Sequence, residues 1–162
     1  MEHVNRYVDH AKKDWSIIQE AEVPVTLMKK DYILTGKIDL IRGKDGTVEI
    51  VDFKTENKPD MNSEEGKEKL RRYERQLEIY AHIIQERYNH TVSRMHLYYT
   101  STENENPLIS YDYKQSTINQ TISEIDTVVG KIEGKNFDHT HIKKCAKQCD
   151  NCDIQPFCWK NT

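Results

Sequence analysis

One segment constrains the fold most strongly: residues 36–54, with the sequence GKIDLIRGKDGTVEIVDFK. It consists of two mainly apolar runs, 32–42 and 47–54, separated by the short link GKDG at 43–46. Glycine and aspartate tolerate the positive φ angles of tight turns, and β-branched residues flank the link on both sides. The segment therefore predicts a β-hairpin.

Charged residues interrupt these apolar runs, and Asp39, Asp52 and Lys54 are the ones that carry the argument. Because side chains alternate between the faces of a strand, Asp52 and Lys54 share one side and Phe53 takes the other. Half-burying such charges is costly unless they serve a purpose. Carboxylate oxygens suit Mg²⁺ or Mn²⁺, which lowers the pKa of a bound water, and a lysine can orient or deprotonate an attacking water. We predict a hydrolytic metal site; the alternative is a surface ion pair of little consequence.

Further elements are expected on both sides of the hairpin. Apolar spacing predicts helices at 3–19, from about 64, and at 117–132, and strands at 23–28, 92–100 and 108–113. The order of these elements is typical of an α/β fold, a mixed sheet with helices packed on it. If the first three strands form a meander, Glu22 enters the sheet beside Asp39 as a third acid.

The helix that begins near residue 64 carries an unusual charge pattern. Its first half contains Lys67, Lys69, Arg71, Arg72 and Arg75. Cations near a helix N-terminus oppose the macrodipole, so contact with a polyanion explains them better than helix stability does; a solvated face is the alternative. Arg72, Gln76 and Tyr80 follow one another by one turn, on a stripe at the edge of the apolar face.

The whole chain has 162 residues, which fits one domain, and a formal charge of −3. This charge argues against a uniformly basic nucleic-acid binder and leaves room for a local basic patch. No run reaches the ~20 apolar residues of a membrane span, and residues 1–22 carry charge throughout, unlike a signal peptide. We therefore expect no membrane partner and a cytoplasmic location.

All four cysteines are crowded near one end, in the pattern C-x3-C-x2-C-x5-C. They are Cys145, Cys149, Cys152 and Cys158. A secreted disulfide framework would spread its cysteines through the fold, so this crowding favours ligation of a metal or cluster. Four thiolates suit either a [4Fe–4S] cluster or Zn²⁺, and reduced, unligated thiols are the third possibility.

The order of three motifs closely resembles that of the RecB-type nuclease domains of the PD-(D/E)xK superfamily. The motifs are G-K-I-D at 36–39, V-D-F-K-T at 51–55 and Q-L-E-I-Y at 76–80. More narrowly, the chain from about Glu22 to Cys158 looks like the nuclease domain at the C-terminus of UvrD-type DNA helicases. The resemblance implies a restriction-endonuclease-like mixed β-sheet flanked by helices over residues 1–135, followed by a cysteine-rich tail at 136–162.

The resemblance also implies roles for individual residues. Asp39 and Asp52 match the metal ligands, the main-chain carbonyl of Phe53 can add a third ligand, and Lys54 matches the catalytic lysine. Glu22 matches an acid often found before the first strand.

Other parts of the resemblance concern the nucleic acid and the tail. Gln76 and Tyr80 match the Q-x-x-x-Y motif, which supports the active site and contacts the nucleic acid; we add Arg72 and Arg75 from their charge and helical position. The end of the tail resembles iron–sulfur members, although those usually take one cysteine from upstream of the core and this chain has none there. An active-site helix found upstream in relatives is also missing, which suggests a fragment.

Together these features predict a Mg²⁺- or Mn²⁺-dependent deoxyribonuclease, an exonuclease rather than an endonuclease. A helicase in the same parent chain and a role in DNA repair or recombination are implied. Three alternatives remain: a non-catalytic DNA-binding module with the same fold, a stand-alone CRISPR-associated exonuclease, and an interaction module whose cysteines dock a partner protein.

Overall fold

The computed structural model describes residues 5, 7–9, 15–44, 46–102, 106–136 and 152–153. The chain divides into two compact units, Met1–Asp126 and Thr127–Thr162, and the first contains the whole sheet. Within the described ranges, no helix is both long enough and apolar enough to cross a membrane.

The first unit is built on a five-stranded sheet with the order β1-β2-β3-β4-β5. Its strands are β1 (Ile18–Met28), β2 (Ile33–Lys44), β3 (Thr47–Lys54), β4 (Thr91–Tyr99) and β5 (Leu108–Asp112). Neighbouring strands are antiparallel except β3 and β4, which run parallel. A parallel pair needs a long crossover connection, and the helix α2 (Glu64–Tyr88) supplies it. The predicted mixed sheet is confirmed.

The predicted hairpin is the pair β2–β3, in register from Leu40↔Val51 to Lys44↔Thr47. Gly43 has a φ of 151° and Gly46 a φ of 78°, backbone conformations that side chains disfavour. A Cβ at Gly43 would also collide with the backbone of Thr47. Glycine is therefore required at the turn for a steric reason, as the sequence indicated.

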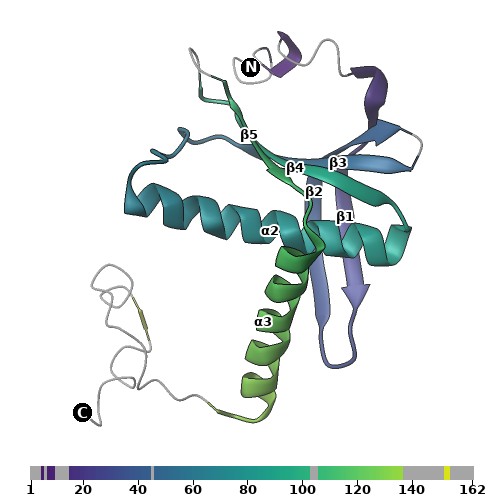
Figure 1. The fold of residues 1–162 in the computed structure, drawn as a ribbon, viewed down its shortest axis with the longest axis vertical. Helices are drawn as coiled ribbons and strands as arrows, with labels where there is room; N and C mark the ends of the chain where they lie inside the picture. The colour runs from purple at the N-terminus through teal and green to yellow at the C-terminus, as the bar shows by residue number, and fades with distance from the viewer. Residues whose placement is uncertain are drawn as a thin grey trace. The chain divides into compact units, whose positions relative to one another are not determined.

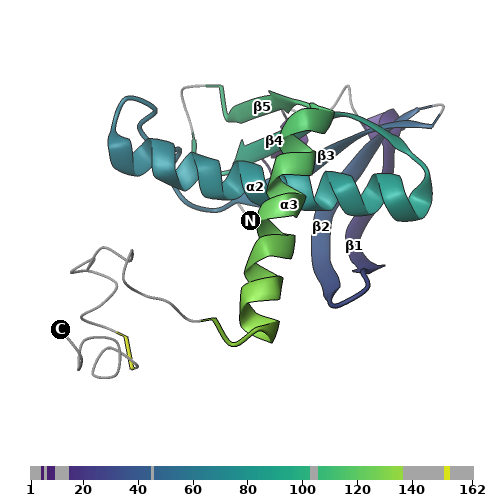
Figure 2. The same ribbon diagram turned by 60° about the horizontal axis from the view of Figure 1, so that its bottom comes forward.

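The helix α2 crosses one face of the sheet (Figures 1 and 2). It begins where the Ser63 side chain accepts a hydrogen bond from Gly66 N at 3.0 Å, and it ends at Asn89, whose φ of 53° is left-handed. These are the usual start and stop chemistries of a helix. The last helix, α3 (Gln115–Glu133), contributes Ile118 and Ile122 to the main core.

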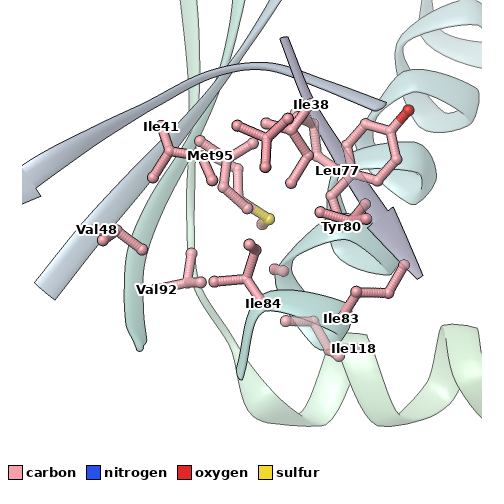
Figure 3. Close-up of a cluster of buried hydrophobic side chains, with 14 of the residues drawn as sticks. Ile38, Ile41, Val48, Leu77, Tyr80, Ile83, Ile84, Val92, Met95 and Ile118 are labelled. Atoms are coloured by element: carbon pink, nitrogen blue, oxygen red, sulfur yellow. The ribbon is translucent and has the colours of Figure 1, made fainter. Parts of the chain in front are cut away.

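The main core lies between the sheet and α2 (Figure 3). Fully buried side chains from the sheet meet those of α2: Ile38, Val48, Ile50, Met95 and Leu97 face Leu77, Ala81, Ile83 and Ile84. A smaller cluster on the opposite face joins Leu40, Val51 and Tyr98 with Tyr7 and Phe53. The ring centroid of Tyr7 lies 4.8 Å from that of Phe53 and 5.0 Å from that of Tyr98, in edge-to-face geometry.

One predicted element is wrong at its end. The expected helix at 3–19 gives way to a single 3-10 turn, η1 (Trp15–Ile17), and β1 then begins at Ile18 rather than at Val23. Ile18 pairs with Arg42 of β2, with a register shift before Glu20. Pairing along the sheet edge satisfies the backbone groups there, and this outweighs a helical spacing of apolar residues.

Candidate active site

The candidate site lies where β2 and β3 separate. Their paired register ends at Leu40↔Val51, so the next amide of β3 has no ladder partner on that side. The side chain of Asp39 supplies one, because its Oδ2 accepts a hydrogen bond from Phe53 N at 2.7 Å. Asp39 is thus tied to the end of β3 through the backbone beside Asp52.

The alternation of β2 breaks at Asp39. Ile38 belongs to the core under α2, whereas Leu40 belongs to the cluster on the opposite face. In a regular strand, residues two apart share a face, so the chain must twist locally at Asp39. This twist turns the carboxylate toward the end of β3.

Glu22 stands across from this point, between Ala21, paired with Leu40, and Val23, paired with Ile38. Its φ of 57° is unusual for a residue other than glycine. The Glu22 carboxylate is 63% exposed and forms an ion pair with Lys37. The structure therefore places Glu22 opposite Asp39 in the sheet, with its charge directed to Lys37 rather than to Asp52 or Lys54.

Asp52 and Lys54 share the face of β3 that α2 covers, as the strand alternation predicted. Lys54 Nζ lies 2.6 Å from Asp52 Oδ2, and the side chains are 15% and 6% exposed. Burial raises the pKa of Asp52, the ammonium of Lys54 opposes this, and the charge of Asp39 raises it further. The carboxylate thus stands in an environment that favours an added positive charge.

Among the described residues, the buried oxygen Oδ2 of Asp52 receives no hydrogen bond of good geometry, although Lys54 Nζ is its ion-pair partner. Buried polar atoms are normally hydrogen-bonded, so this oxygen has capacity for another ligand. Carboxylate oxygens are the donors that Mg²⁺ and Mn²⁺ prefer. The described residues contain no group of three or more His, Cys, Asp or Glu side chains arranged around one point. The donors present fit a cation that keeps several waters.

Gln76, near the middle of α2, links the charged residues to the helix. Its Nε2 donates to Asp52 Oδ1 at 3.4 Å and to the Tyr80 hydroxyl at 2.9 Å, and its Oε1 lies 3.4 Å from Lys54 Nζ. The Tyr80 ring lies against Gly36, where a Cβ would overlap the ring. Gly36 therefore contributes to the site by making room for Tyr80, a role the hairpin pattern did not reveal.

The two arginines predicted to contact the nucleic acid, Arg72 and Arg75, differ in placement. Arg75 Nη2 lies 2.5 Å from Glu124 Oε2 of α3 and so faces away from Gln76. Arg72 is exposed, one turn before Gln76, and has no ion-pair partner among the described residues. Of these two arginines, Arg72 is the one whose charge is not engaged by an ion-pair partner in the described part of the chain.

Two further residues, Tyr73 and Glu56, reach the site, although the sequence had not singled them out for it. The ring centroid of Tyr73 lies 4.0 Å from Lys54 Nζ, and the Tyr73 hydroxyl donates to Glu56 Oε1 at 2.7 Å. Tyr73 lies at helical spacing from Leu70 and Leu77, a spacing that is typical of a core residue. No local signal distinguishes an aromatic ring that packs on apolar atoms from one that packs on an ammonium.

The predicted cluster or zinc ligands lie almost entirely outside the described residues. Cys145, Cys149 and Cys158 belong to that part of the chain, and Cys152 alone is described. The prediction of a [4Fe–4S] cluster or Zn²⁺ in the tail stays a prediction.

Comparison with known proteins identifies the family to which this chain belongs. The profile of the PD-(D/E)XK nuclease superfamily matches residues 1–159. The chain belongs to this superfamily. No curated protein matches the sequence.

Two solved structures share the fold at low sequence identity. The first is a protein of Eubacterium rectale named as a candidate exonuclease, with a TM-score of 0.56 and 12% identity over 96% of this chain and 59% of that one. The second is the protein SSO0001, with a TM-score of 0.51 and 16% identity over 99% of this chain and 67% of that one. The predicted restriction-endonuclease-like α/β fold is confirmed, and the chain spans somewhat under two thirds of the first protein's length.

Proposed function

We propose that this chain is a Mg²⁺- or Mn²⁺-dependent deoxyribonuclease domain. The single observation that carries the proposal is the convergence of Asp39, Asp52 and Lys54 at the end of β3. Two carboxylates and a lysine at one sheet end, in a chain of a nuclease superfamily, form a set suited to phosphodiester hydrolysis.

The residues have distinct tasks in this proposal. Asp39, Asp52 and the main-chain carbonyl of Phe53 would hold the divalent cation. Such a cation supplies an activated water and neutralises charge that develops on the phosphate. Lys54 carries three donors on a flexible stem, so its ammonium can hold the attacking water and the scissile phosphate, or take part in moving the proton. Gln76 orients Lys54 and Asp52 through its amide.

For the substrate, we favour DNA ends over internal sites, hence an exonuclease. Arg72 offers a free positive charge beside Gln76 and Tyr80, a place where a phosphate group of the strand could bind. We also propose a RecB-type architecture, with a UvrD-type helicase in the same parent chain acting in repair or recombination; the resemblance in motif order supports this. In the same proposal the tail cysteines hold a [4Fe–4S] cluster or Zn²⁺, which iron, sulfide and zinc analysis of the purified protein would distinguish.

A second candidate function is a DNA-binding module without catalysis. One observation favours it: the Glu22 carboxylate is engaged with Lys37, which leaves two acids at the end of β3. A metal held by two carboxylates keeps more waters and binds more weakly than one held by three.

The deciding experiment is cleavage of end-labelled single- and double-stranded DNA in Mg²⁺ or Mn²⁺. The wild type should cleave, Asp52→Ala should not, and Asp112→Ala is the matched control because it removes an exposed carboxylate from the edge strand β5. DNA binding without cleavage, equal in wild type and Asp52→Ala, would instead establish the binding module.

A further inference from the structure

The ammonium of Lys54 is surrounded by three different kinds of partner. Asp52 Oδ2 lies 2.6 Å away, Gln76 Oε1 lies 3.4 Å away, and the ring centroid of Tyr73 lies 4.0 Å away. A cation within about 6 Å of an aromatic face is attracted by the ring quadrupole, more strongly when water is excluded. The Lys54 side chain is only 15% exposed, so this attraction is not screened by bulk water.

The contact with Asp52 is the one that catalysis would weaken. In the proposed function, Asp52 also faces a divalent cation, whose charge repels the ammonium. The Tyr73 ring has no such second task, because it carries no charge and contacts the lysine from α2. It can therefore keep the ammonium in place when the carboxylate is shared.

Tyr73 is itself held by a hydrogen bond to Glu56, which forms a second ion pair with Lys69. Its hydroxyl donates to Glu56 Oε1, and Glu56 Oε2 accepts from Lys69 Nζ at 2.5 Å. Burial alone would raise the pKa of Glu56, but hydrogen bonds from Lys69 and Tyr73 and the nearby ammonium groups together lower it. Burial and the charge of Glu56 raise the pKa of Tyr73 to about 12, so the phenol keeps the proton that it donates. The Tyr73 side chain is thus held at its hydroxyl by Glu56, while the face of its ring contacts Lys54 Nζ.

We propose that Tyr73 is a positioning residue for Lys54: its ring holds the ammonium at the end of β3, and Glu56 with Lys69 orients the ring. The inference rests on the proposed nuclease function. It adds a pair, Tyr73 and Glu56, that act through Lys54 and do not touch the substrate.

The first test separates the ring from the hydroxyl. Tyr73→Leu should lower kcat for DNA cleavage by about 3- to 30-fold and leave KM within about twofold, the effect expected from losing a partly desolvated cation–π contact. Tyr73→Phe keeps the ring but loses the hydrogen bond to Glu56, so its kcat should lie between that of Tyr73→Leu and that of the wild type. Tyr111→Leu is the matched control, because Tyr111 packs half-buried against the same core without touching Lys54.

A second measurement does not depend on cleavage. In protein carrying ¹³C-labelled lysine, the Tyr73 ring current should displace the Lys54 ε-CH₂ signal, which the Lys54→Arg variant identifies by its absence. The displacement should persist in Tyr73→Phe and Tyr111→Leu and vanish in Tyr73→Leu.

The outcomes of the two tests are separable. An undisplaced Lys54 signal in the wild type, or equal kcat in Tyr73→Leu and Tyr111→Leu, would overturn the positioning role. A wild type that does not cleave DNA but shows the displaced signal would overturn the nuclease proposal and the catalytic purpose of the contact, while supporting the contact itself.

Discussion

Two polar clusters lie on opposite faces of the same strands, and they differ in how completely their atoms are paired. The candidate site faces α2, whereas the far-face cluster consists of Arg42, Glu49, His96 and Ser110. In the far-face cluster, Glu49 Oε2 accepts a hydrogen bond from Arg42 Nε at 2.9 Å, and Arg42 Nη2 lies 2.9 Å from the same oxygen. His96 Nε2 lies 3.3 Å from the same oxygen, and its Nδ1 lies 2.9 Å from Ser110 Oγ.

The candidate site is paired less completely. Among the described residues, the hydroxyl of Tyr99, which pairs with Lys54 across β3 and β4, is buried without a hydrogen-bond partner, and Asp52 Oδ2 has the ion pair with Lys54 but no hydrogen bond of good geometry. A saturated buried network stabilises one structure, whereas an unsaturated one costs stability and leaves capacity for a ligand. The difference supports a structural role for the far-face cluster and the proposed functional role for the site.

Exchanging a carboxylate for an amide in the site should affect activity far more than stability. Asp39→Asn should reduce cleavage by about 10³-fold or more, since a cation's charge stabilisation of several kcal/mol depends on the carboxylate. The amide oxygen can still accept from Phe53 N, so the free energy of unfolding should change by less than about 1 kcal/mol. Cleavage assays and urea denaturation of the same preparation measure both.

The same exchange in the far-face cluster should have the opposite effect. Glu49→Gln leaves the largely buried Arg42 and His96 facing a neutral amide, which should cost roughly 2–3 kcal/mol of unfolding free energy. Cleavage by the folded variant should stay within about twofold of the wild type. A large loss of kcat without a loss of stability would contradict the assignment of the two faces.

The pH dependence of the free energy of unfolding is a further test of the far-face cluster. Burial lowers the pKa of His96 below its ordinary 6.5, with Glu49 opposing the shift. Below pH 6.5 the unfolded chain therefore binds more protons than the folded one, so the free energy of unfolding falls as the pH drops from 6.5 through the folded pKa. In His96→Gln this slope should be smaller.

His82 needs a separate control in the acid titration. Burial and the neighbouring Lys29 lower its pKa as well, so His82→Gln should remove a different part of the same slope. Unchanged slopes in both variants would show that the buried imidazoles are not the source.

The smallest expected effect is a gain in stability. Tyr99 is fully buried and its hydroxyl has no hydrogen-bond partner in the described ranges, so Tyr99→Phe should raise the free energy of unfolding by up to about 1 kcal/mol. Tyr73→Phe is the matched comparison, because it removes a hydroxyl that donates to Glu56 and should lower stability by about 1 kcal/mol. Thermal unfolding of the two variants should move in opposite directions.

Much of the fold follows from local patterns. The glycines at 43 and 46 determine the hairpin turn, Ser63 caps α2, and the spacing of apolar residues identifies α2 and four of the strands within a few residues. The expected helix at 3–19 failed at its end because the pairing of Ile18 with Arg42 is a contact between segments distant in sequence.

The candidate site, like the fold, could be predicted from local patterns only in part. Strand alternation by itself placed Asp52 and Lys54 on one face, and the contact at 2.6 Å agrees with it. The separation of Arg72 from Arg75 was not visible, because both are exposed cations on one helix and only the position of Glu124 on α3 distinguishes them.

The sequence by itself determined the order of the elements, the hairpin and the face on which the charged residues of β3 lie, because these depend on residues close together in the chain. The tertiary structure decided which side chains complete the site. Gln76 reaches Asp52, Tyr73 reaches Lys54 and Tyr80 fits against Gly36 only because α2 crosses the sheet where β2 and β3 separate. A crossing of that kind is set by core packing between distant segments, which no local pattern encodes.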